Sequence, residues 1–309
     1  MDTFAQQLVN GLVLGSIYAL VALGYTMVYG ILELINFAHG EITMMGAMVA
    51  LTVIGLLLEQ QTGLPGVVIV LAGLSVGVVV CMALGFTIER VAYRPLRRAP
   101  RLAALITAIG VSILLQNLAM VIWGRRYITF PDILPSAQFE ISGVTITALQ
   151  ISIILLSCLL MWGLWLLVSR TRLGRAMRAT AQSPELAGLM GINPNHVISR
   201  TFIIGAALAA VAGVMVAAYD TQMHYYRGFM LGLKAFTAAV LGGIGNIAGA
   251  MLGGMLLGIL ESLGAGYIGA LTGGFLGSHY QDVFAFFVLI LVLVFRPTGL
   301  LGERVGERA

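Results

Sequence analysis

The chain has 309 residues, of which 59% are hydrophobic and only 10% are charged, with a mean hydropathy of +0.98. Soluble domains carry about 25% charged residues, so this chain has too few to cover a water-facing surface and is too hydrophobic to be disordered. The net charge of +4 comes almost entirely from arginines in a few clusters, since Lys234 is the only lysine, and it does not indicate a nucleic-acid partner. The composition predicts an integral membrane protein.

Charge-free stretches of about 20 residues are long enough to cross a hydrocarbon core of about 30 Å as helices. The sequence predicts an all-α, polytopic membrane protein with about eight spans plus broken or re-entrant segments, in a single transmembrane domain over residues 1–309. A last apolar run, Val283–Phe295, can span only if it extends back through Asp282, Gln281 and Tyr280. The other stretches are Thr3–Leu32, Ile42–Leu58, Gln60–Ile88, Leu102–Gly124, Ile141–Ser169, Thr201–Tyr219, Ala235–Leu260 and Ser262–Gln281.

The segment from Ile35 to Glu41 interrupts the first two apolar stretches with the densest group of polar residues within the apolar part of the chain. The interruption fits either a loop or a break within the membrane. Polar side chains at membrane depth are costly and often functional. One interpretation is structural: Asn36 caps a helix that starts at Phe37, and Glu41 lies near the positive end of its dipole. The other is direct contact with a substrate. One histidine and two carboxylates with no second cluster do not predict a metal site. The polar residues concerned are Glu33, Asn36, His39 and Glu41, with Gly40 between the last two.

Two arginine blocks orient the spans, because short cytoplasmic loops are enriched in arginine and lysine. Two crossings, Leu102–Trp123 and about Ala148–Val168, separate the blocks, so both can be cytoplasmic. The C-terminal tail also carries arginines and is expected on the same side, whereas the side of the N-terminus stays open. The arginines are Arg90, Arg94, Arg97, Arg98 and Arg101 in the first block, Arg170, Arg172, Arg175 and Arg178 in the second, and Arg296, Arg304 and Arg308 in the tail.

A second interruption falls in the glycine-rich region Leu233–Tyr267, which must cross twice or enter and return. Either a broken helix or an ordinary surface loop fits its spacing. Broken apolar segments in both halves of a membrane protein indicate a transport site, because half-helix ends present backbone N–H and C=O groups to a cavity. The candidate substrate pathway therefore combines Asn36, His39, Gly40 and Glu41 with Gly242, Gly243, Gly245 and Asn246.

Isolated polar residues elsewhere are assigned more modest roles. Glu261 is expected at a helix end, with interior pairing to an arginine or a proton relay as alternatives. His196, His224 and His279 lie near the ends of predicted spans and are expected at the interface. The two cysteines lie in apolar stretches and do not predict a disulfide.

The loop at about residues 169–200 carries the signals of a short helix. Ser183 suits the N-cap, Pro184 the first helical position and Glu185 the first turn. Gly191 suits the C-terminal cap. The small residues Ala187 and Gly188 are expected to form a face for docking. A helix this short needs a partner, which is either its own bundle or a cytoplasmic motor subunit.

Three segments together resemble the branched-chain amino acid ABC transporter permeases, specifically the LivH-like subunit. They are Gly30–Glu41, Gly174–Ala179 continuing to Glu185–Ile192, and Ala238–Asn246. The resemblance implies a type II ABC-importer-like permease of a bacterial inner membrane. The expected partners are a LivM-like second permease, two cytoplasmic ATPases and a periplasmic substrate-binding protein. It also implies that the ATPases contact residues 183–191.

The chain has no Gly-x-x-x-x-Gly-Lys-Ser/Thr phosphate loop, so ATP and Mg are expected on partner subunits, with no cofactor in this chain. Because importers of urea and short amides are close relatives of the family that the chain resembles, an ABC permease for these solutes is one alternative. A proton-coupled secondary transporter using Glu33, His39, Glu41 or Glu261 is the competing hypothesis. No Ser/His/Asp or Cys/His arrangement supports an enzyme.

Overall fold

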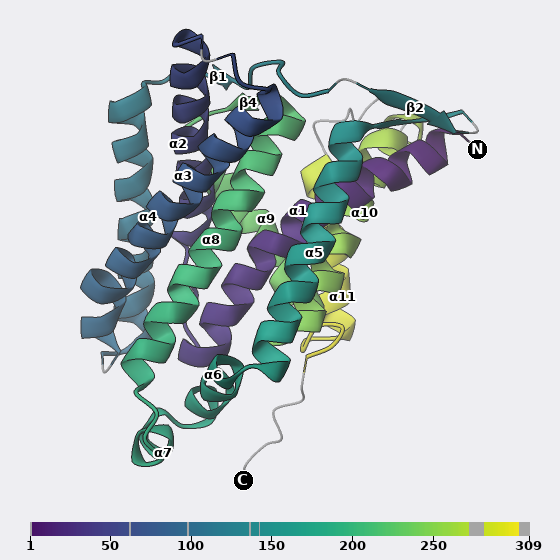
Figure 1. Cartoon of the computed structure of the whole chain (residues 1–309). Helices are drawn as coiled ribbons and strands as arrows, with labels where there is room; N and C mark the ends of the chain where they lie inside the picture. The colour runs from purple at the N-terminus through teal and green to yellow at the C-terminus, as the bar shows by residue number, and fades with distance from the viewer. Residues whose placement is uncertain are drawn as a thin grey trace.

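The structure is a computed structural model that describes residues 2–61, 63–97, 99–135, 137–141, 143–271 and 281–302. In this part of the chain, seven helices are long and apolar enough to cross a membrane. This confirms the predicted all-α, polytopic fold (Figure 1). The seven are α1 (Asp2–Leu32), α2 (His39–Glu59), α3 (Gly66–Ile88), α4 (Arg101–Trp123), α5 (Ala148–Arg170), α8 (Pro194–Asp220) and α10 (Ile247–Leu271).

Shorter elements connect and flank these helices. A π-helical turn, η1 (Glu89–Tyr93), and a 3-10 turn, η2 (Arg94–Leu96), extend α3. The remaining helices are α6 (Arg172–Gln182), α7 (Pro184–Leu189), α9 (Arg227–Gly242) and α11 (Gln281–Phe295). The strands are β1 (Ile128–Thr129), β2 (Gln138–Ile141), β3 (Val144–Thr147) and β4 (Gln222–Met223), which pair antiparallel as β1 with β4 and β2 with β3.

The two ends of the bundle differ in content. The N-terminus and the strands lie at one end, which we call the strand end, and α6 and α7 lie at the other, which we call the loop end (Figure 1). The chain after α11 returns to the loop end, where the Leu300 amide donates to the Leu241 carbonyl at 2.9 Å. The second arginine block and Arg296 therefore share one end, as their charge predicted. Arg98, Arg304 and Arg308 lie outside the described residues.

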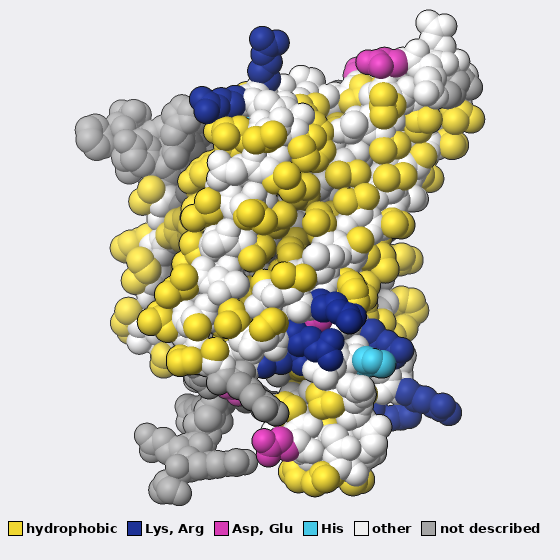
Figure 2. All heavy atoms as spheres, turned by 90° about the vertical axis from the view of Figure 1, so that its left-hand side faces the viewer, with side chains coloured by type: hydrophobic (Ala, Val, Ile, Leu, Met, Phe, Trp, Pro, Cys, Tyr) yellow, Lys and Arg dark blue, Asp and Glu magenta, His cyan; other side chains and the backbone are white. Residues whose placement is uncertain are grey.

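The outer surface between the two ends is apolar. Figure 2 shows a broad band of hydrophobic side chains with basic side chains gathered toward its lower part. Arg90, Arg94 and Arg200 line one depression there. Exposed leucine, isoleucine and valine side chains on α3, α4 and α5 suit contact with lipid rather than water.

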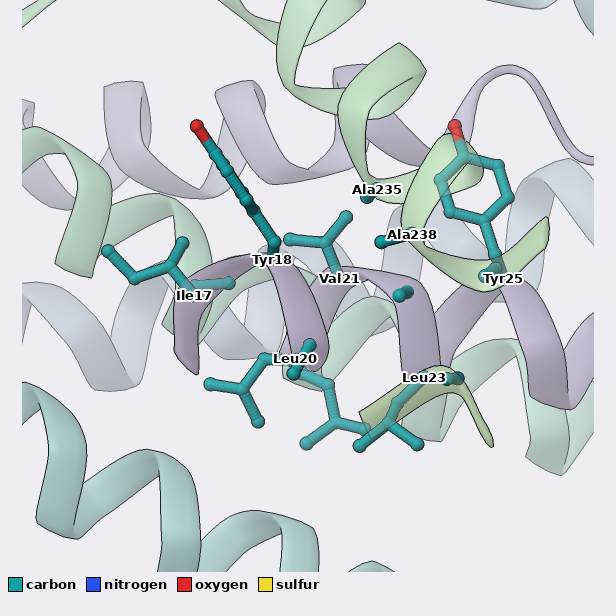
Figure 3. Close-up of a cluster of buried hydrophobic side chains, with 14 of the residues drawn as sticks. Ile17, Tyr18, Leu20, Val21, Leu23, Tyr25, Ala235 and Ala238 are labelled. Atoms are coloured by element: carbon teal, nitrogen blue, oxygen red, sulfur yellow. The ribbon is translucent and has the colours of Figure 1, made fainter. Parts of the chain in front are cut away.

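Helix α1 forms the centre of the bundle. Its residues from Ile17 to Leu23 are almost completely buried, and Tyr18 and Tyr25 point to the opposite side of the helix from Leu20 and Leu23 (Figure 3). Glycines allow α1 and α10 to pack backbone to backbone, since a Cβ on Gly258 would lie 2.1 Å from the Gly15 nitrogen.

Some predicted span boundaries are wrong. The helix expected over Gln60–Ile88 begins only at Gly66. The boundary expected at Glu261 does not exist, because α10 continues through it. The expected span Ser262–Gln281 lies partly outside the described residues. The last helix, α11, starts at Gln281 and is 15 residues long.

Candidate functional site

The second membrane helix starts inside the bundle. Helix α1 ends at Leu32, and Glu33 turns the chain with a left-handed φ of +52°. The first residue of α2, His39, then packs against Gly24 and edge-on against the Tyr25 ring at 4.9 Å between centroids. Gly24 lies eight residues before Leu32, which corresponds to about 12 Å along the helix. The segment between α1 and α2 is therefore a break within the bundle, which is one of the two interpretations that the sequence leaves open.

Asn36 stabilises this break, although not as predicted. Its side-chain oxygen accepts from the Ala38 amide at 3.2 Å and from the Tyr93 hydroxyl at 2.9 Å. The expected helix start at Phe37 is wrong, because α2 begins at His39 and its N-cap position is Ala38. Because its side chain accepts from Ala38, two positions further along the chain, Asn36 instead caps the turn that precedes α2.

Glu41 brings a carboxylate to the middle of the bundle. It lies in the first turn of α2, as predicted, and is fully buried. One carboxylate oxygen, Oε1, accepts from the Gln116 amide at 2.7 Å and from the Ser112 hydroxyl at 3.1 Å. Ser112 is the midpoint of α4, so the site lies halfway along a spanning helix. The sequence does not predict either partner, because Ser112 and Gln116 carry no charge and nothing in the spacing pairs them with Glu41.

A second helix also begins here. Helix α9 starts at Arg227, and its Gly228 and Gly232 pack against Gly40 of α2 so closely that a Cβ on Gly40 would lie 2.3 Å from the Gly228 carbonyl oxygen. The sequence analysis did not identify this start. The four-residue spacing of Gly228 and Gly232 is typical of close helix packing in membranes and could have revealed it.

The glycine-rich segment predicted as the second break is a turn at the loop end. Gly243 and Gly245 adopt φ values of +109° and +94°, and the Asn246 side chain donates to the Leu301 carbonyl at 2.9 Å. The surface-loop alternative is therefore correct for Gly242 to Asn246. The structure brings Asn36, His39, Gly40 and Glu41 together but does not bring Gly242, Gly243, Gly245 or Asn246 to them.

Two cavities lie on either side of the buried middle of α1. The first, of about 250 Å³, lies toward the strand end between α1, α8 and α9 and includes Tyr18 and Lys234. The second, of about 560 Å³, lies at the loop end and includes Tyr29, Arg178 and Gly245. A path between the two ends would have to pass the Tyr18–Tyr25 stretch of α1.

Glu261 is not at a helix end, so that prediction is wrong. It lies inside α10, is nearly buried, and accepts from the Lys234 ammonium at 2.7 Å and the Tyr18 hydroxyl at 3.2 Å. The alternative of interior pairing holds in part, with a lysine in place of an arginine.

The loop helix forms as predicted. Pro184 is its first residue, the Ser183 hydroxyl accepts from the Leu186 amide at 3.2 Å, and Gly191 ends the element with a φ of +82°. Glu185 lies in its first turn, and a Cβ on Gly188 would meet no described atom within 4 Å.

The expected docking face of α7 needs correction. Ala187 is only 4% exposed and packs against its own chain, so it shares no open face with Gly188. Three large apolar side chains are instead turned outward: Leu186 is 64% exposed, and Leu189 and Met190 are each 83% exposed.

The remaining candidates lie away from the central site. His196 is exposed at the start of α8, and His224 stacks on Tyr127 at the strand end, whereas His279 lies outside the described residues. Cys81 and Cys158 are free thiols. Within the described ranges, no three His, Cys, Asp or Glu side chains gather into a possible metal site.

The chain has two helices, α2 and α9, that start inside the bundle, a cavity toward each end of the bundle and an apolar outer belt. These features define a polytopic membrane permease. Residues 7–293 match the family model of the branched-chain amino acid transport system permease component. The chain belongs to this family.

Its relatives among the branched-chain amino acid permeases match over nearly their whole length. The high-affinity branched-chain amino acid transport system permease protein BraD of Pseudomonas aeruginosa is 50% identical over 99% of this chain and 98% of its own. LivH of Escherichia coli K12, which carries the same description, is 47% identical over 99% of this chain and 97% of its own. A probable branched-chain amino acid transport permease protein LivH of Methanocaldococcus jannaschii is 30% identical over 95% of this chain and 91% of its own.

Proposed function

We propose that this chain is the permease subunit of an ATP-driven importer for branched-chain amino acids in a bacterial inner membrane. The observation that carries the proposal is near full-length similarity to BraD and LivH, whose names specify this transport. The partners proposed with it are a LivM-like permease, two ATPases that bind ATP and Mg, and a periplasmic substrate-binding protein. The loop end, with its arginines, faces the cytoplasm.

Coupling to the ATPases takes place through α6 and α7. Leu186, Leu189 and Met190 form an exposed apolar surface on a helix too short to be stable in isolation. Helix α6 follows α5 directly, and its Arg178 donates to the Val168 carbonyl and also lines the loop-end cavity. A displacement of α7 by the ATPases is therefore transmitted through α6 to this cavity.

The central site is the element that rearranges during transport. Helices α2 and α9 start side by side at Gly40 and Gly228, where each contributes an N-terminal end to the interior. Helix α9 lines the strand-end cavity and leads into the turn from Ile244 to Asn246, which lines the loop-end cavity. Tilting of α9 relative to α1 would open one cavity while closing the other, which is the alternation that transport requires.

The proton-coupled alternative is not favoured. Its strongest candidates for a proton-carrying carboxylate are Glu261 and Glu41. One oxygen of each is held by other side chains, because Glu261 pairs with Lys234 and Glu41 accepts hydrogen bonds from Gln116 and Ser112. The second oxygen of each carboxylate is buried without a hydrogen-bond partner among the described residues, so it is the near full-length similarity to BraD and LivH that disfavours this alternative.

Uptake of radiolabelled leucine tests the proposal. The chain and its neighbouring subunits would be produced in a bacterium that lacks branched-chain amino acid import. We expect uptake to stop when the phosphate loop of the ATPases is mutated, and to continue in the presence of a proton uncoupler while ATP is maintained. Excess isoleucine should inhibit the uptake, whereas urea and acetamide should not. Uptake that follows the proton gradient and ignores the ATPase mutation would contradict the proposal.

A further inference from the structure

The strand-end cavity between α1, α8 and α9 combines an apolar wall with charged groups of both signs. Leu14 and Ile17 of α1 and Leu231 of α9 supply apolar surface. Asp220, Arg227 and Lys234 line the same cavity. At about 250 Å³ it is smaller than the roughly 300 Å³ at which pockets for drug-sized ligands begin, so it suits a small solute.

The charges around this cavity balance. Arg227 forms an ion pair with Asp220, and Lys234 lies 2.7 Å from Glu261. Two cationic and two anionic side chains give a local charge of zero, so the cavity has no net attraction for a simple anion or cation. Such an arrangement matches a solute that carries one charge of each sign.

The position of the basic groups follows from helix geometry. Arg227 and Lys234 are seven residues apart on α9, which places them two turns apart on one face. Lys234 is held from the side by Tyr18, with Nζ 5.7 Å from the centre of its ring. Figure 3 shows the Tyr18 ring projecting from α1, with its hydroxyl away from the helix. The two cations are thus fixed at different depths of the cavity.

The ion pair nearest the opening is suited to exchange its partners. The side chains of Arg227 and Asp220 are 43% and 26% exposed, and ion pairs with this much solvent access are weak. An entering carboxylate can take the guanidinium fork of Arg227 while an entering ammonium takes Asp220. The exchange replaces one ion pair by two and leaves no charge unmatched.

We propose that this cavity is the site where the permease receives its solute as a zwitterionic α-amino acid. Arg227 binds the carboxylate, Asp220 binds the ammonium, and Leu14, Ile17 and Leu231 contact the aliphatic side chain, while Lys234 stays paired with Glu261 at another depth of the cavity. The proposal rests on the proposed function, since it assigns the polar contacts of an imported amino acid.

Cysteine protection in the assembled importer tests this directly. Met230 lines the cavity and is partly exposed, so Met230→Cys in a Cys158→Ala background reports access by a hydrophilic maleimide. We expect leucine to slow labelling, whereas 4-methylpentanoate, which lacks the ammonium, and isoamylamine, which lacks the carboxylate, do not. Asp220→Asn or Arg227→Gln should raise the leucine concentration for half-protection about tenfold, and Arg125→Gln, an exposed arginine at the same end, should not.

Leucine uptake by the same complexes distinguishes failure of the proposed cavity site from failure of the proposed function. If the Met230→Cys complex imports leucine with ATP but leucine gives no protection, or the two analogues protect equally well, the zwitterion site is wrong and the proposed function stands. If the unmodified complex imports no leucine, both are wrong. Arg227→Lys keeps the charge but loses the fork, so leucine should protect it better than Arg227→Gln and less well than the unmodified residue, which distinguishes lost binding from lost folding.

Discussion

Gly24 of α1 and His39 of α2 are in direct contact, and a Cβ on Gly24 would come within 2.1 Å of the His39 Nε2 atom. Because His39 is the first residue of α2 and is nearly buried, this contact fixes where the helix begins relative to α1. The half-way start of α2 thus depends on the absence of a side chain at one position of a neighbouring helix.

Gly24→Ala should therefore destabilise the bundle. The added methyl group must displace the imidazole, which costs about 1–3 kcal/mol in a packed interior, and the melting temperature of the purified protein in detergent should fall. Gly24→Ala combined with His39→Ala should recover part of the loss. Gly55→Ala is the matched control, because a Cβ there would meet no described atom within 4 Å. Equal melting temperatures for Gly24→Ala and Gly55→Ala would contradict the contact.

Gln116→Leu should destabilise the centre of the bundle. It removes the donor at 2.7 Å from the buried Glu41 carboxylate, and a buried acceptor deprived of its donor costs about 1–3 kcal/mol. Asn117→Leu is the control on the same helix, since the Asn117 side chain is exposed and donates only locally, to the Ile113 carbonyl. Chemical denaturation of both variants in mild detergent measures the difference, and an equal loss in the two would argue against a role for Gln116.

Arg97→Ala should be more damaging than the loss of any other arginine near it. Arg97 pairs with Glu89, which is fully buried at the start of η1 and also accepts from the Ser199 hydroxyl at 2.5 Å. Breaking a buried pair by removing one partner costs about 3–5 kcal/mol. Arg94→Ala removes an exposed side chain and should have little effect. Adding Glu89→Gln to Arg97→Ala should restore some stability, and a further loss in the double variant would refute the pairing.

Leu189→Glu should uncouple the permease from its ATPases without unfolding it. Leu189 is exposed, so the charge costs little in the isolated chain but places a carboxylate in the proposed apolar contact. Phe139→Glu is the control, since Phe139 is an exposed aromatic on β2 at the strand end. Copurification of the ATPases should be lost with the first variant and kept with the second. Copurification unaffected by Leu189→Glu would exclude this contact surface.

Composition and charge patterns were sufficient for the fold and for the first break. Long charge-free stretches predict most of the spanning helices, and the polar cluster from Asn36 to Glu41 predicts an interruption, although the sequence leaves open whether it lies inside the membrane. These signals are local, because a helix must be apolar along its own length to lie in a membrane.

Such local patterns do not predict contacts between segments that are distant in the sequence. Glu261 ends a charge-free stretch, which predicts a helix end. In the structure, Lys234, 27 residues earlier, neutralises its charge within the bundle. The start of α9 was missed because Arg227 is satisfied by Asp220 and the glycines that follow face α2. Pairing across helices decides which polar residue is a boundary and which is part of the interior.

Affinity purification of the tagged chain from its own membranes in a mild detergent, followed by mass spectrometry, tests whether the chain is an importer subunit. We expect two ATPase chains and a second polytopic permease to be recovered with it, and we expect Leu189→Glu to release the ATPases but not the second permease. Recovery of the chain alone, in a detergent shown to preserve other membrane complexes, would contradict the assignment as an importer subunit.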